Sequence, residues 1–164
     1  MKTIYHGIIA VVLLLWLFPP TQTYSQSSTH NYVQSTEVLD SQVLMPDQLS
    51  QLSGRQVRNT INYYDGLGKL VQSIVKGKSP GNHDMVTYTE YDDFGRVVDN
   101  YLPFTKEDNN GAYIEDAKTD LMSFYGSPAY TGIPQTYIPY GFQRYDDSPL
   151  NRIVETSLPG DGYE

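Results

Sequence analysis

An internal repeat of a turn motif constrains the fold of this chain more than any other feature. Tyr-Asp-x-x-Gly followed by Lys or Arg occurs at 64–69 and again, 27 residues later, at 91–96. The repeated positions are Tyr64, Asp65, Gly68, Lys69, Tyr91, Asp92, Gly95 and Arg96. Asp accepts hydrogen bonds from backbone amides ahead of it, and glycine adopts positive φ at no steric cost. Each string therefore predicts a tight turn between two strands.

A third, altered copy of the motif starts at Tyr145-Asp146 and returns at Arg152. Its turn is longer, through 148–151, and contains no glycine. In each copy the Asp and the Lys or Arg that opens the return strand are placed for a cross-hairpin ion pair. Exposed pairs of this kind contribute about 0 to 1 kcal/mol to stability.

The pattern around these turns predicts β-structure. Val57, Ile61 and Tyr63 fall on one face of an extended chain, opposite polar residues. Fifteen tyrosines, many beside branched side chains, are typical of pleated, half-buried surfaces. We predict a mainly β fold of tandem antiparallel hairpins. The expected strands are 57–64, 69–76, 85–91, 96–102 and 152–156.

One amphipathic helix is expected at 112–125. Its apolar positions Ile114, Ala117, Leu121 and Tyr125 are three or four residues apart. Glu115 and Asp116 would lie in the first turn, where negative charge stabilises the helix dipole. Gly126 is expected to end the helix in the left-handed conformation, with Pro128 preventing its resumption.

The first 25 residues have the layout of a secretory signal peptide. A lysine at position 2 precedes an unbroken apolar run over 8–18, which Pro19 and Pro20 end. This run is about half of what a transmembrane helix needs. Thr23 and Ser25 suit signal peptidase, so cleavage is expected after Ser25. The chain contains no cysteine, which excludes lipidation and disulfides.

Three regions follow from this reading. Residues 1–25 are the signal peptide, and 26–56 form a polar, weakly ordered leader with a single helical turn at 46–52. Residues 57–164 form the β-rich domain. The chain is expected to be exported to the periplasm, the cell surface or the medium, with no membrane attachment after cleavage.

Composition and spacing argue against several classes of function. The net charge of −8, with no basic cluster longer than 76–78, disfavours nucleic acid as a partner. A phosphate-binding loop ending at 77–79 would need a glycine at Gln72. An EF-hand with Gly111 at its sixth position would place Lys106 where a carboxylate is required. We predict no catalytic, cofactor-binding or metal-ligating residue.

The turn strings resemble the YD repeat of RHS and teneurin-like proteins. Longer stretches resemble a domain of unknown function that follows the signal peptide of large RHS-repeat proteins in Gram-negative bacteria. They are Tyr63-Tyr64-Asp65-Gly66-Leu67-Gly68, Tyr88-Thr89-Glu90-Tyr91-Asp92-Asp93-Phe94-Gly95-Arg96, Tyr101-Leu102-Pro103-Phe104 and Ser148-Pro149-Leu150-Asn151-Arg152. The resemblance covers roughly residues 57–160.

The resemblance implies a structural role. In such proteins the repeats build a β-sheet that coils into a shell, and the C-terminal region often carries a toxin or other effector. The chain is expected to begin or cap that shell without chemistry of its own, with downstream YD repeats of the same polypeptide as its partner, and to be truncated at its C-terminal end. The alternative is an extracellular adhesion or carbohydrate-binding module, whose partner would be a surface glycan or protein.

Overall fold

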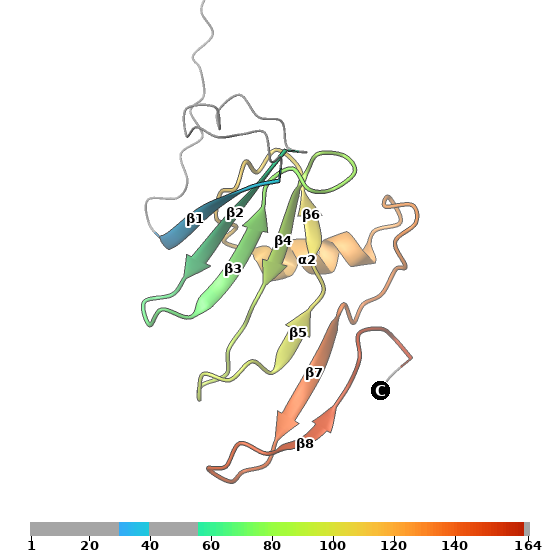
Figure 1. Ribbon diagram of the computed structural model, residues 1–164. Coiled ribbons are helices and arrows are strands. Elements are labelled where there is room, and N and C mark those ends of the chain that lie inside the picture. The colour runs from blue at the N-terminus through green and yellow to red at the C-terminus, as the bar shows by residue number, and fades with distance from the viewer. Residues whose placement is uncertain (1–29, 40–55, 163–164) are drawn as a thin grey trace, which may run out of the picture.

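The computed structural model describes residues 30–39 and 56–162. The expected signal peptide and the helical turn at 46–52 lie outside these residues. Within them the fold is mainly β, as predicted, with two antiparallel sheets and one short α-helix (Figure 1). No helix in this part of the chain is long and apolar enough to cross a membrane.

The first sheet has five strands in the order β1-β2-β3-β4-β6. Its strands are β1 (Asn31–Val38), β2 (Val57–Tyr64), β3 (Leu70–Val75), β4 (Asp84–Tyr88) and β6 (Phe104–Lys106). The second sheet has the order β5-β7-β8, from β5 (Asp99–Tyr101), β7 (Tyr140–Tyr145) and β8 (Ile153–Thr156). Figure 1 shows the second sheet below the first.

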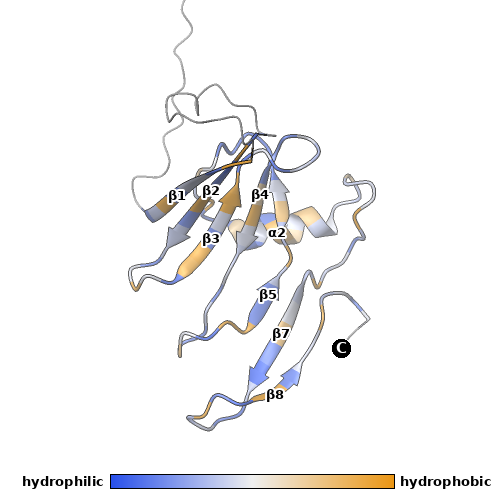
Figure 2. Ribbon diagram, in the orientation of Figure 1, coloured by the Kyte–Doolittle hydropathy of each residue, from blue (hydrophilic) through white to orange (hydrophobic). Residues whose placement is uncertain are grey.

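The core lies between the first sheet and helix α2 (Ala117–Gly126). Alternate side chains of the sheet turn toward the helix because side chains of a strand alternate between its two faces. Ile61 and Tyr63 of β2, Ile74 of β3 and Val86 of β4 are completely buried there. Hydrophobic residues mark β3, β4 and α2 in Figure 2, whereas β5 and much of β7 are hydrophilic. The first sheet and the segment that contains α2 therefore supply nearly all of the buried apolar side chains.

The helix is shorter than predicted and begins at Ala117. Ile114 is buried as expected, but its backbone N–H donates to Gln72 Oε1 and its carbonyl accepts from Gln72 Nε2. This contact holds Ile114 against the sheet, and Glu115 precedes the first turn of the helix. The end also differs, since Gly126 is the last helical residue and the chain leaves through an extended Ser127 at φ −90°. A residue before proline favours this extended conformation.

Strand β1 corrects the prediction of a weakly ordered leader. It pairs with β2 at all eight positions, from Asn31 opposite Tyr64 to Val38 opposite Val57. All eight β1 residues are exposed, so the strand lacks the apolar alternation that would have revealed it. A polar sequence is typical of a strand at the edge of a sheet.

The second predicted hairpin is also altered. Its two arms meet at one bridge, between Tyr91 and Val97. β4, before this bridge, belongs to the first sheet, whereas β5, after it, pairs with β7 in the second. The turn at 91–96 is therefore where the chain first passes from the first sheet to the second, before β6 returns to the first.

Candidate functional site

The first two Tyr-Asp turns, called repeat 1 (64–69) and repeat 2 (91–96), have the same hydrogen bonds. Asp65 Oδ1 accepts from the backbone N–H groups of Leu67 and Lys69, at 2.9 and 2.8 Å. In repeat 2 the Asp92 Oδ1 atom accepts equivalent bonds from Phe94 and Arg96, at 3.0 and 2.8 Å. The Asp of the motif therefore closes each turn from its start.

The glycine of each turn has the backbone conformation that the motif predicts. Gly68 has φ +79° and Gly95 has φ +76°, a region that L side chains adopt only with strain. Each glycine N–H also donates to the carbonyl of the Asp three residues earlier. The predicted turn chemistry of both repeats is therefore present in the structure.

Repeat 3 (145–152) forms a hairpin turn between β7 and β8. Asp146 Oδ1 accepts from Ser148, and Asp146 Oδ2 accepts from Arg152 Nε at 2.9 Å. Asn151 has φ +51° immediately before Arg152 and so takes the place of the motif glycine. Asn tolerates this conformation better than most residues. The sequence showed only that glycine was missing, not which residue replaced it.

The three aspartates differ in how they bind the following cation. Arg96 binds Asp92 through Nε and Nη2, both at 2.8 Å from Oδ2, and Arg152 binds Asp146 through Nε. The pKa of Asp92 lies below its usual range, chiefly because of the hydrogen bond from the Arg96 backbone amide and also because of the Arg96 guanidinium. The pKa of Asp146 is also lowered, chiefly by the Ser148 hydroxyl. Lys69 instead reaches toward repeat 2.

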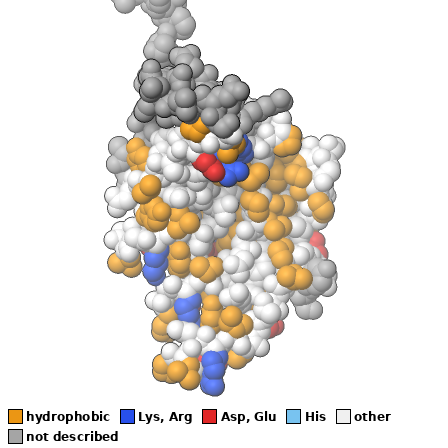
Figure 3. Space-filling view, in the orientation of Figure 1, with side chains coloured by type: hydrophobic (Ala, Val, Ile, Leu, Met, Phe, Trp, Pro, Cys, Tyr) orange, Lys and Arg blue, Asp and Glu red, His pale blue; other side chains and the backbone are white. Residues whose placement is uncertain are grey.

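Successive repeats contact each other through a cation and a tyrosine ring. Lys69 Nζ lies 5.0 Å from the centre of the Tyr91 ring, and Arg96 Cζ lies 4.4 Å from the centre of the Tyr145 ring. Both distances are within the range of cation–π attraction. The cations of repeats 1 and 2 thus each pack on the first residue of the repeat that follows. Figure 3 shows Lys and Arg side chains interleaved with hydrophobic ones along the edge where these turns lie.

A hydrogen bond accompanies each of these ring contacts. The Tyr91 hydroxyl donates to the Leu70 carbonyl at 3.0 Å, and the Tyr145 hydroxyl donates to the Val97 carbonyl at 3.4 Å. In both cases the acceptor is the residue directly after the cation. Seven of the eight predicted motif residues take part in the turn hydrogen bonds or in these contacts between repeats. The eighth, Tyr64, is the last residue of β2 and pairs with β1.

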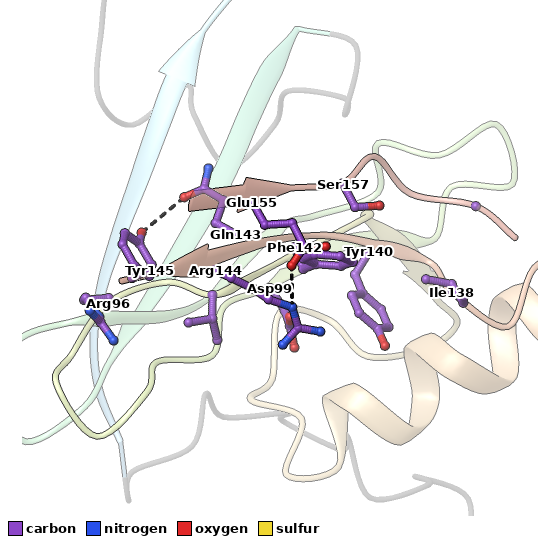
Figure 4. Close-up of a pocket in the computed structure, with 12 residues that line it drawn as sticks. Arg96, Asp99, Ile138, Tyr140, Phe142, Gln143, Arg144, Tyr145, Glu155 and Ser157 are labelled. Carbon is purple, nitrogen blue, oxygen red and sulfur yellow. Dashed lines mark hydrogen bonds and ion pairs between the residues drawn. The ribbon is translucent and has the colours of Figure 1, made fainter. Parts of the chain in front are cut away.

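A cavity of about 850 Å³ lies beside repeat 3, on the second sheet (Figure 4). Tyr140 and Phe142 of β7 line it together with Asp99, Arg144 and Glu155. Arg144 Nε pairs with Glu155 at 3.0 Å, and its guanidinium lies 4.8 Å from the centre of the Phe142 ring. The cavity therefore combines aromatic and charged side chains that already contact one another.

A second group of polar side chains surrounds Tyr101 at the junction of the two sheets. Its hydroxyl lies 2.8 Å from Glu90 and 3.2 Å from Asp99, and Lys118 donates to Glu90 at 2.7 Å. The Lys118 hydrogen bond lowers the Glu90 pKa, whereas burial raises the Tyr101 pKa above its usual value. The phenol stays protonated and the carboxylate charged, so the group holds the helix against β5.

The weaker chemical motifs of the sequence occupy turns. Gly77 follows β3, and its N–H donates to the buried carboxylate of Asp84 at 3.0 Å. Gly111 donates to the same carboxylate, which ties the 108–111 loop to β4. His83 lies 3.8 Å from Glu107. Within residues 30–39 and 56–162, no three His, Asp or Glu side chains are grouped to hold a metal ion.

Comparison with known proteins identifies the family. Residues 34–164 match the family described as Domain of unknown function (DUF6443). The chain belongs to this family. The match begins at residue 34, within β1, so the family domain includes the second part of the strand that was predicted to belong to a leader. Neither the curated proteins nor the solved structures contain a match to the chain.

Proposed function

We propose that this DUF6443 domain is a non-catalytic structural module that begins the β-shell of an exported RHS/YD-repeat protein. The observation that supports this proposal is the recurring contact between repeats. Repeat 1 meets repeat 2 through the same cation, ring and carbonyl positions through which repeat 2 meets repeat 3. A contact that recurs in one direction is what a sheet built by successive addition needs.

The position of β1 favours the start of such a shell. β1 covers the whole length of β2 on the side away from repeat 2, and it contains no Tyr-Asp motif. The recurring contact between repeats therefore has no counterpart on that side. The repeats would then extend from the other end of the domain only. The proposed parent protein acts in surface interaction or in delivery of a C-terminal effector.

The carboxylates of the repeats support a structural role. Asp65, Asp92 and Asp146 all accept backbone N–H groups of their own turns. Asp84 accepts two further backbone N–H groups from separate loops. Carboxylates engaged in this way hold the backbone, whereas a general acid or base needs a group directed at a substrate. We therefore propose no catalytic residue.

The test is to read the coding DNA beyond codon 164 in all three frames, over several kilobases. We expect further Tyr-Asp-x-x-Gly-Lys or Arg codons, in the same frame or after a frame change. An unrelated gene directly after a clean stop, with no such codons in any frame, would refute the proposal.

Carbohydrate binding is the second candidate, and the cavity beside β7 is the observation that favours it. Tyr140 and Phe142 line this cavity together with the charged groups of Asp99, Arg144 and Glu155. However, Arg144 lies over one face of Phe142, and Arg96 lies over one face of Tyr145. Sugars bind aromatic side chains through these same faces. Titration of the protein with a panel of surface glycans distinguishes the two candidates. A structural module of the shell should show no saturable binding. If a glycan does bind in the cavity, Phe142→Ala should abolish that binding.

A further inference from the structure

A third contact recurs between the repeats, and it is made by the backbone. Thr89 N donates to the Val71 carbonyl at 3.0 Å, and Gln143 N donates to the Val98 carbonyl at 2.7 Å. Val71 and Val98 each lie two residues after the cation of their repeat, and Thr89 and Gln143 each lie two residues before the next tyrosine. The ring, hydroxyl and backbone contacts therefore form one fixed set that relates each repeat to the next.

Repeat 3 contains the acceptor side of this set, which a following repeat would meet with its donors. Tyr145 is paired with Ile153, as Tyr64 is paired with Leu70 in repeat 1. In both hairpins the register then shifts, so that Val154 and Val71 are passed over by the partner strand. In repeat 1 this bulge leaves the Val71 carbonyl to accept Thr89 N of the following strand. The bulge in β8 gives Val154 the equivalent place.

The corresponding surface of repeat 3 is uncovered in the described part of the chain. The Arg152 side chain is 67% exposed, compared with 22% for Arg96, which packs on the next repeat. Ile153 and Val154 are 53% and 66% exposed. Among the described strands, β8 pairs with β7 alone. An edge with branched apolar side chains and unpaired backbone groups is suited to receive another strand.

Arg152 is already bound to the aspartate of its own turn through its Nε atom, one of the atoms that Arg96 uses. Asp146 accepts from Arg152 Nε at 2.9 Å, just as Asp92 accepts from Arg96 Nε at 2.8 Å. Arg96, bound to Asp92 in this way, places its guanidinium over the Tyr145 ring. The single Nε hydrogen bond to Asp146 likewise holds the guanidinium of Arg152, and no aromatic ring of the described residues lies over it.

We propose that β8 is the docking edge for one further Tyr-Asp hairpin from the continuing polypeptide, a step that rests on the proposed function above. The tyrosine of that hairpin packs its ring on Arg152 and donates its hydroxyl to the Ile153 carbonyl. The backbone N–H two residues before that tyrosine donates to the Val154 carbonyl. Continuity with the two existing contacts selects this occupant over a second copy of the chain.

The test is to extend the chain after Glu164 with its own residues 85–102, joined by a flexible linker of about 12 residues with a reach of roughly 20 Å. Amide hydrogen exchange is measured on Ile153–Thr156. We expect exchange of the β8 amides that face away from β7 to slow by at least tenfold. Arg152→Met, or Leu in place of the grafted tyrosine, should remove most of this protection. Arg152→Lys should retain it, because Lys69 already makes this contact in repeat 1.

Three results would overturn the inference. The graft could leave β8 exchange unchanged, in which case the edge does not accept the hairpin. If the β8 amides of the extended chain were protected equally after Arg152→Met or after replacement of the grafted tyrosine, the pairing would not need the contact between cation and ring. Sedimentation of the unextended chain as a dimer with protected β8 amides would assign the edge to a second copy. The graft result and the downstream coding sequence are independent, so failure of one proposal is distinguishable from failure of the other.

Discussion

The Nζ atom of Lys69 occupies the space that a Cβ atom on Gly95 would need. Gly95 is therefore needed for its positive φ, and a side chain there would also displace the flexible end of Lys69 from the preceding repeat. Gly68 has nearly the same φ, but nothing lies near its own Cβ position. Substitution of Gly68 therefore tests backbone strain alone, whereas substitution of Gly95 tests backbone strain together with the contact between repeats.

Gly68→Ala should destabilise the protein by about 1 to 2 kcal/mol, the cost of a left-handed alanine. Gly95→Ala should cost about 0.5 to 1 kcal/mol more, because the Lys69 side chain must also leave its place on Tyr91. Urea unfolding of both variants measures this difference. In the Lys69→Ala background the two substitutions should cost the same. A difference that persists there would show that Lys69 does not cause it.

Gln72 is the buried link between the sheet and the segment before α2. Its side chain is 1% exposed, and its amide satisfies both the N–H and the carbonyl of Ile114. Gln72→Leu should cost about 2 to 4 kcal/mol, because two buried backbone groups lose their partners. Ser73→Ala on the same strand is the matched control. It removes one half-buried hydrogen bond to Asn62 and should cost about 1 kcal/mol or less.

Thermal and urea unfolding of the two variants check this prediction. A Gln72→Leu cost no greater than that of Ser73→Ala would contradict the assigned role. It would mean that Ile114 finds other partners when the amide is lost.

The sequence predicted the local turns well because their causes are local. The Asp and Gly positions of repeats 1 and 2 specify their own hydrogen bonds within five residues. It did not predict where the helix starts, because Ile114 is withdrawn from the helix by Gln72, 42 residues away.

The candidate site was predicted in part for the same reason. The eight motif residues were identified, but the cation of one repeat and the ring of the next belong to different hairpins. The sequence offered one signal for this contact, since Lys69 and Arg96 each follow the motif glycine directly. Strand β1 gave no such signal, because an exposed edge strand needs no apolar alternation.

Buried tyrosines should limit stability at alkaline pH. Burial raises the pKa of Tyr63, Tyr101 and Tyr125 above the ordinary value near 10. The unfolded chain therefore loses these protons first. The contribution of these protonated tyrosines to the free energy of unfolding is complete below about pH 10. It is lost as the pH rises from there through the folded-state pKa values.

We expect the melting temperature to fall above about pH 10 and a fraction of the tyrosine absorbance at 295 nm to appear only on unfolding. Tyr101→Phe should flatten part of this alkaline fall, whereas Tyr137→Phe, at a residue that is 83% exposed, should not. Smooth titration of all tyrosines in the folded protein would contradict the prediction.

Asp92 should make stability depend on acid pH in the opposite sense. Its pKa is lowered in the folded state, chiefly by the Arg96 backbone amide. Its stabilisation is therefore present above the unfolded pKa of about 3.9 and is lost as the pH falls through the folded-state value. Asp92→Asn should lower the melting temperature at pH 7 and leave it nearly unchanged at about pH 2. Asp93→Asn at the exposed neighbouring position is the control. An equal decrease at both pH values would show that the carboxylate charge has no part in the turn.

Export of the chain is predicted from the layout of residues 1–25. The feature of this segment that matters most is the unbroken apolar run over 8–18. In a Gram-negative host we expect an exported product whose N-terminus is Gln26, which N-terminal sequencing of the periplasmic and extracellular fractions would establish. Leu14→Arg places a charge near the middle of the run, where it costs about 2.5 to 3.5 kcal/mol on insertion scales, and should retain the precursor in the cytoplasm. Leu14→Ile keeps the run apolar and should be exported normally. An uncleaved chain held in the membrane would show instead that the run acts as an anchor, and a Leu14→Arg variant exported as well as the original would show that the run does not direct export.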